Sequence, residues 1–245
     1  MLSQEKGLKA CYTRLARPLL PTPINVRVRF QKIGDLQYIS HLDLQRTFHR
    51  ILVRAGIPMW YTKGFNPHAK IVFSTPLSVG AQSVCEMLDI RIDREISCEE
   101  IKQLLNNEVT EELRILDVYV AETKFSDIAW ATYEIALHEE GIAARADEIL
   151  DILKKDEIVT TKKTKSGEKE INIRPLIREF STESIEDGNG LLIKTMLSIG
   201  SDNYLNPELL LSVLKEQLSL LASPDAWYTV MRKETYKEDG QTIFR

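Results

Sequence analysis

The sequence predicts an α+β protein made of two tandem ferredoxin-like domains, each with the element order β-α-β-β-α-β. Its 245 residues are enough for two domains of about 100 to 125 residues each. Segments with the two-residue period of strands alternate with segments that have helical periodicity and recognisable caps. The same order of elements recurs after a polar segment at residues 122–127.

The first half of the chain shows the β-α-β-β-α-β order most clearly. Val26, Val28 and Phe30 alternate with polar residues, which indicates a strand with one buried face. A helix capped by Ser40 should follow and end at Gly56. We expect further strands at residues 59–61, 70–74, 87–93 and 114–122, with a second helix at about residues 97–107 that Ser97 caps.

The same order recurs in the second half, where a hairpin stands between the first helix and the next strand. We expect strands at residues 130–138, 191–199 and 227–234, helices near residues 142–155 and from Asn206-Pro207 onward, and a hairpin at residues 157–164 and 168–173 that turns at Lys165-Ser166-Gly167. The expected domains are therefore an N-terminal extension at residues 1–23, a first domain at residues 24–124 and a second at residues 128–245.

The charge is divided unequally between the two halves. The net formal charge is only −4, but residues 1–80 hold 12 Lys and Arg against three acidic residues, which gives +9 and leaves −13 for the rest. A basic first domain suggests an anionic partner, most commonly nucleic acid. An acidic second domain that packs on the basic one would explain the same count.

Composition argues against several classes of protein. No apolar run approaches the roughly 18 to 20 residues of a membrane span, and residues 1–23 lack an apolar signal core, so we expect a cytoplasmic protein without membrane contact. Cys11, Cys85 and Cys98 form no close pair, which fits packing residues in a reducing compartment. No metal site and no cofactor are predicted.

The first predicted helix carries a row of arginines beside its apolar stripe. Arg46, Arg50 and Arg54 follow one another at intervals of four residues, so they share one face. Asp43 can offset Arg46, but no acid on this face serves the other two. A phosphate backbone would relieve their repulsion, because Arg binds phosphate in a bidentate way. A solvated face, or one covered by acidic residues, would also explain the row.

The segment Tyr61-Thr62-Lys63-Gly64-Phe65-Asn66-Pro67-His68 should form a structured loop between two short strands. Lys63, Phe65 and His68 could project together from this loop to contact a nucleotide or a phosphate. The residues that we select as candidates for nucleic-acid binding are Arg46, Arg50, Arg54, Lys63, Phe65, Asn66, His68 and Lys70.

Three of the four histidines, His41, His49 and His68, fall in this region. His41 and His49 are eight residues apart on a helix, about 12 Å of rise, so they cannot easily share a metal. His41 and His68 are candidate general acids or bases, because imidazole titrates near neutrality. Local hydrogen bonding by His41 in the first helical turn is the structural alternative.

Arg27 and Arg29 should point to the sheet face that the helices leave open. They are candidate contacts there for a bound partner. Cross-strand ion pairs with Asp89 or Asp93 would instead give them a structural role.

Several short motifs stand out in the first domain. They are Phe30-Gln31-Lys32-Ile33-Gly34, Tyr38-Ile39-Ser40-His41-Leu42-Asp43, Arg54-Ala55-Gly56-Ile57-Pro58 and Lys63-Gly64-Phe65-Asn66-Pro67-His68-Ala69-Lys70. Together they resemble the bacterial radical-SAM-linked protein family, a domain of unknown function, over roughly residues 24–220. The resemblance implies an accessory protein that works with a radical SAM enzyme. The chain lacks the three-cysteine motif of those enzymes, so it could only be their partner or a substrate-presenting module.

Three functional hypotheses follow. The first is a non-catalytic adaptor that binds RNA or a ribosomal substrate for a radical SAM enzyme. The second is a metal-independent endoribonuclease in which His41 acts as general acid or base. The third is a protein-only interaction module whose basic surface docks on an acidic patch of the partner enzyme.

Overall fold

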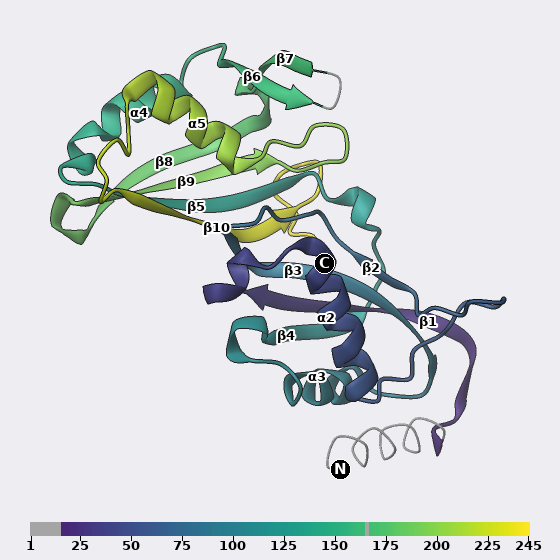
Figure 1. The fold of residues 1–245 in the computed structure, drawn as a ribbon. Coiled ribbons are helices and arrows are strands. Elements are labelled where there is room, and N and C mark those ends of the chain that lie inside the picture. The colour runs from purple at the N-terminus through teal and green to yellow at the C-terminus, as the bar shows by residue number, and fades with distance from the viewer. Residues whose placement is uncertain (1–15, 165–166) are drawn as a thin grey trace. The chain divides into compact units, whose positions relative to one another are not determined.

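The computed structural model describes residues 16–164 and 167–245 of a mixed α+β chain (Figure 1). The chain divides into two compact units, residues 1–125 together with Arg245 (unit 1) and residues 126–244 (unit 2). Residues 1–15 with Cys11, and Lys165 and Ser166 of the expected hairpin turn, lie outside the described residues.

Unit 1 contains an antiparallel sheet in the order β4-β1-β3, with β2 paired to β3. Its elements along the chain are β1 (Leu19–Lys32), η1 (Gly34–Tyr38), α2 (His41–Arg54), β2 (Ile71–Phe73), β3 (Ala81–Arg94), α3 (Cys98–Asn106), η2 (Glu111–Leu113) and β4 (Ile115–Val120). Strand β1 begins at Leu19, so the expected N-terminal extension to residue 23 reaches into the sheet.

The core of unit 1 lies between one face of this sheet and both helices. The alternating residues Val26, Val28 and Phe30 are buried against the apolar stripe of α2, where the Phe30 and Phe48 ring centroids are 4.6 Å apart. Ile101 of α3 belongs to the same cluster. Helices α2 and α3 therefore cover the same face, and the opposite face carries Arg27 and Arg29.

Both helices of unit 1 begin as the sequence predicts. The Ser40 hydroxyl accepts a hydrogen bond from the Asp43 amide at 3.1 Å, and the Ser97 hydroxyl accepts one from the Glu100 amide at 3.1 Å. Each serine thus satisfies one of the amide groups that the first turn leaves without an intrahelical partner.

Unit 2 contains a four-stranded antiparallel sheet in the order β10-β5-β9-β8 and a separate two-stranded sheet of β6 and β7. Helices α4 and α5 contact each other above β8 and β9 (Figure 1). The turn η3 (Phe125–Asp127) spans the boundary between the units, and the elements of unit 2 that follow it are β5 (Trp130–His138), η4 (Ile142–Arg145), α4 (Ala146–Leu153), β6 (Val159–Thr164), β7 (Gly167–Asn172), η5 (Arg174–Leu176), β8 (Ile177–Ile185), η6 (Glu186–Gly188), β9 (Gly190–Ser198), α5 (Pro207–Leu218) and β10 (Trp227–Tyr236).

The structure differs from the sequence-based expectation at further elements, and β3 begins at Ala81, six residues before the expected start. Residues 59–61 form only isolated bridges, Met59 with Ile92 and Tyr61 with Ala69, because they lead into a loop. The expected helix at residues 142–155 is divided into η4 and α4. Strand β8 was not predicted, since its residues are mostly exposed and lack a regular apolar alternation.

No helix in the described part of the chain is long and apolar enough to cross a membrane. Of the cysteines, Cys85 is buried in β3, Cys98 is half-buried at the start of α3, and both are free thiols.

Candidate functional site

The arginine row of α2 is exposed along the helix. Arg46, Arg50 and Arg54 all lie on the solvent side, while Leu44, Phe48, Ile51 and Leu52 are buried in the core. The periodicity of the sequence therefore separates the two faces as expected.

Two of the three arginines have acidic partners. Arg46 forms an exposed ion pair with Asp43 at 3.2 Å, and hydrogen bonds from Ser40 and then Arg46 hold the pKa of Asp43 below its usual range. Arg54 lies 2.6 Å from Glu108, an acidic partner that does not belong to α2 and that the sequence did not reveal. Glu108 follows α3, and the packing of α3 beside α2 brings its carboxylate close to the Arg54 guanidinium. Arg50 forms no ion pair with any residue that the structure describes.

The chain between α2 and β2 forms a closed loop at residues 62–68 that projects from unit 1 (Figure 1). At its base the Thr62 amide donates to the His68 carbonyl at 3.0 Å, and the His68 amide donates to the Thr62 hydroxyl at 3.1 Å. Phe65 lies near the middle of the loop with its side chain fully exposed. Gly64 has a φ of 139°, a backbone conformation that residues other than glycine rarely adopt.

The polar residues of this loop remain at the surface. Lys63, Asn66, His68 and Lys70 are exposed. His68 Nδ1 lies 3.1 Å from the Thr62 hydroxyl oxygen and 3.3 Å from the Asn66 carbonyl oxygen, so one edge of the imidazole is held by the loop. His68 therefore has a local structural role in closing the loop.

His41 is exposed in the first turn of α2, where its Nε2 lies 2.9 Å from Gln45 Nε2. Its ring meets Phe73 edge to face at 5.5 Å between centroids. These contacts match the local hydrogen bonding considered as the structural alternative for His41. Within residues 16–164 and 167–245, no group of three or more His, Cys, Asp or Glu side chains could hold a metal ion.

Arg27 is completely buried rather than available on the open face of the sheet. Its guanidinium donates to both carboxylate oxygens of Asp89, at 2.7 and 2.9 Å, and to the Thr123 hydroxyl and carbonyl oxygens, at 2.7 and 2.9 Å. The expectation that Arg27 contacts a partner is therefore wrong, because cross-strand pairing with Asp89 engages the side chain. Arg29 is half-buried on the same face.

Sequence reasoning missed a pair of residues at the base of the loop. The Arg91 guanidinium carbon lies 4.8 Å from the centroid of the Trp60 ring, and Arg91 Nε has no hydrogen-bond partner among the described residues. Arg91 alternates with Ile90 and Ile92, which places it on the open face of the sheet. Its contact with Trp60, 31 positions earlier, has no local sequence signal.

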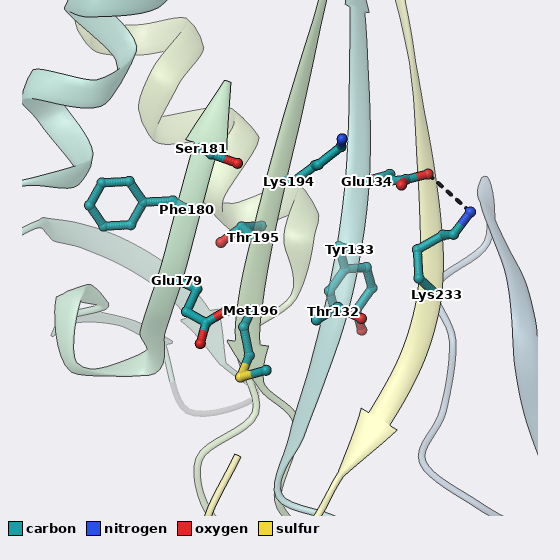
Figure 2. Close-up of a pocket in the computed structure, with 10 residues that line it drawn as sticks. All are labelled: Thr132, Tyr133, Glu134, Glu179, Phe180, Ser181, Lys194, Thr195, Met196 and Lys233. Carbon is teal, nitrogen blue, oxygen red and sulfur yellow. Dashed lines mark ion pairs between the residues drawn. The ribbon is translucent and has the colours of Figure 1, made fainter. Parts of the chain in front are cut away.

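Unit 2 has a shallow groove on its sheet, shown in Figure 2. Glu134 and Lys233 form an ion pair on one side of it at 3.1 Å. Lys194, which also lines the groove, pairs with Glu183 at 2.6 Å. Because these charges balance one another, the groove offers less attraction to a polyanion than the exposed cations of unit 1.

Comparison with known proteins places the chain in a family. Residues 25–207 match the model of the family described as "Uncharacterized protein conserved in bacteria (DUF2344)", and the chain belongs to this family. The expected resemblance to a bacterial domain of unknown function is confirmed to that extent.

The remaining comparisons are with curated proteins and with solved structures. A search of curated proteins finds none that matches this chain. Among solved structures, the chain is similar to one described as "Crystal Structure of a Cbf5-Nop10-Gar1 Complex", with 13% sequence identity and a TM-score of 0.47. The match covers 89% of this chain and 51% of the other, so this chain spans about half the length of that neighbour.

Proposed function

We propose that each unit is a ferredoxin-like domain, the first basic and the second acidic. If the four main strands of each unit are numbered along the chain, both sheets have the order 4-1-3-2. In each unit a helix follows the first and the third of these strands, as the β-α-β-β-α-β motif requires. The β6–β7 hairpin is then an insertion between α4 and β8.

Unit 1 in this proposal binds RNA through its exposed cations. Five of them lie on α2 and around the loop, namely Arg46, Arg50, Arg54, Lys63 and Lys70. The observation that carries the proposal is that only Arg46 and Arg54 form ion pairs with residues that the structure describes. Three exposed cations therefore remain for an anionic partner, and a phosphate backbone supplies regularly spaced anions.

Binding to a fluorescein-labelled RNA, measured by anisotropy in 50 and 200 mM salt, tests this function. About three phosphate contacts should weaken binding on the order of 20-fold between these salt concentrations, because counterions are released on binding. The double variant Arg50→Glu/Lys63→Glu should weaken binding about tenfold or more at 50 mM salt.

The matched control is Arg114→Glu, a charge reversal at an exposed arginine of unit 1 that is paired with Glu111 at 2.7 Å. This variant should bind RNA nearly as well as the unaltered protein. Absence of RNA binding in 50 mM salt, or equal binding by the double variant and the unaltered protein, would contradict the function.

The same proposal gives unit 1 a protein partner, a radical SAM enzyme, for which the protein presents RNA or a ribonucleoprotein substrate. Its support is the resemblance carried by Ser40-His41-Leu42-Asp43 and Gly64-Phe65-Asn66-Pro67-His68. Affinity purification from native cells should recover such an enzyme before and after nuclease treatment. Recovery of RNA without any radical SAM enzyme would remove this part of the proposal.

A further inference from the structure

The loop at residues 62–68 and the Trp60–Arg91 pair are joined through the backbone of Arg91. The Trp60 amide donates to the Arg91 carbonyl at 2.7 Å, and the Arg91 amide donates to the Lys70 carbonyl at 3.3 Å. Both arms of the loop are thus hydrogen-bonded to the same residue of β3. The Arg91 guanidinium consequently lies at the base of a loop whose outer part carries Phe65.

Hydrogen bonds close the base of the loop in the absence of a partner. The Thr62 and His68 hydrogen bonds close it, and the Tyr61–Ala69 bridge follows directly outside them. Because the base is already closed, the backbone on either side of Phe65 loses less conformational freedom on binding than an open loop would.

Phe65 is the most exposed large apolar side chain in the described part of the protein. A phenylalanine buries on the order of 150 to 250 Å² when covered, so leaving its ring in water forgoes a large apolar gain. Nucleobases have π faces that stack on such rings, and cations beside the ring contact the backbone of the same strand. Lys63 and His68 supply exposed polar groups on either side of Phe65 in the chain.

We propose that this loop and the Trp60–Arg91 pair form one site for unpaired RNA, with a base stacked on Phe65 and phosphates contacted by Arg91 and Lys70. This inference rests on the RNA binding proposed for unit 1 and specifies its substrate as single-stranded. In a duplex the bases are stacked on one another and cannot reach the ring. Four residue steps separate Tyr61 from Phe65, at most about 14 Å, which suits a segment of a few nucleotides.

Anisotropy binding of the full chain to an unstructured 12-nucleotide RNA, and to the same RNA annealed to its complement, tests the inference. The single strand should bind about tenfold more tightly than the duplex. Phe65→Ala should weaken binding to the single strand about 5- to 100-fold, the range expected for loss of one base–aromatic stack, and Phe65→Trp should retain it. Arg91→Gln should also weaken binding and reduce its salt dependence.

Two control variants address general effects of substitution. Leu19→Ala removes a side chain of unit 1 that is 65% exposed and lies outside the loop, and Arg114→Gln removes a charge elsewhere in unit 1. Both should bind the single strand like the unaltered protein. Because the Phe65 side chain is fully exposed, its variants test the inference even if Arg91→Gln fails to fold.

The outcomes separate this inference from the broader function. If the unaltered protein binds neither RNA, the RNA-binding function itself is wrong. If it binds both RNAs equally, the inference is overturned while RNA binding stands. The inference is also overturned, while RNA binding by unit 1 stands, if Phe65→Ala binds the single strand normally and Arg50→Glu/Lys63→Glu binds it weakly.

Discussion

The sequence leaves two roles open for Arg27, and the structure distinguishes between them. Its place in an alternating strand was compatible with an exposed contact or with a cross-strand pair. The structure shows it completely buried, with Asp89 and Thr123 as hydrogen-bond partners and the Phe125 ring 4.3 Å from its guanidinium carbon. We therefore assign Arg27 to the stability of unit 1 rather than to binding.

Arg27→Ala should lower the free energy of unfolding by about 3 kcal/mol, because Asp89 would lose its bidentate partner in a largely buried position. Urea unfolding followed by circular dichroism measures this change. Arg50→Ala is the control and should stay within about 0.5 kcal/mol, since Arg50 is exposed. A loss below about 1 kcal/mol for Arg27→Ala would show that the ion pair is not needed for stability.

At the residue scale, the sequence predicts which side chains are exposed better than it predicts their partners. Helical periodicity correctly places Arg46, Arg50 and Arg54 outside the core. The Arg54–Glu108 and Trp60–Arg91 contacts join residues far apart in the chain, so no local pattern could reveal them. Tertiary packing decides both contacts.

At the scale of elements, capping and periodicity were the dependable signals. Ser40 and Ser97 mark the starts of α2 and α3 within a residue, because their side chains meet a backbone requirement that is local. Strand β8 was not predicted, because it has no such local signal. It lies at the end of its sheet with most side chains in water, so its sequence shows no regular apolar alternation.

Ser40→Ala should destabilise unit 1 by about 1 kcal/mol, the usual effect of losing a helix N-cap. The same variant should raise the pKa of Asp43, because the Ser40 hydroxyl donates to its carboxylate at 2.7 Å and is the main cause of the lowered value. Because the pKa of Asp43 is lowered in the folded state, its ionised carboxylate stabilises that state when the pH is above the ordinary carboxyl pKa. This stabilisation is lost as the pH falls through the lowered pKa. The variant should therefore lose less stability on acidification.

Urea unfolding and an NMR titration of the Asp43 carboxyl measure the two effects of Ser40→Ala. Ser40→Thr is the matched control, because its hydroxyl can cap the helix in the same way. An unchanged Asp43 pKa in Ser40→Ala would contradict the role assigned to the Ser40 hydroxyl.

At the scale of the whole molecule, the uneven charge is the feature that most separates the two units. Unit 1 holds 18 Lys and Arg against 14 acidic residues, a net formal charge of +4, and unit 2 holds 14 against 22, a net charge of −8, which together give the −4 of the chain. In unit 1, Arg50, Lys63 and Lys70 are exposed without an ion pair to a described residue. The groove of unit 2 instead holds charges that pair with one another. We therefore expect RNA contacts to concentrate in unit 1.

The most direct test of this claim is ultraviolet crosslinking of the protein to single-stranded RNA, followed by mass spectrometry of the crosslinked peptides. We predict crosslinks in the loop at residues 62–68, with Phe65 the foremost site, and further crosslinks in peptides of α2. Crosslinks confined to residues 126–244, or their absence from the loop while RNA is bound, would contradict the claim.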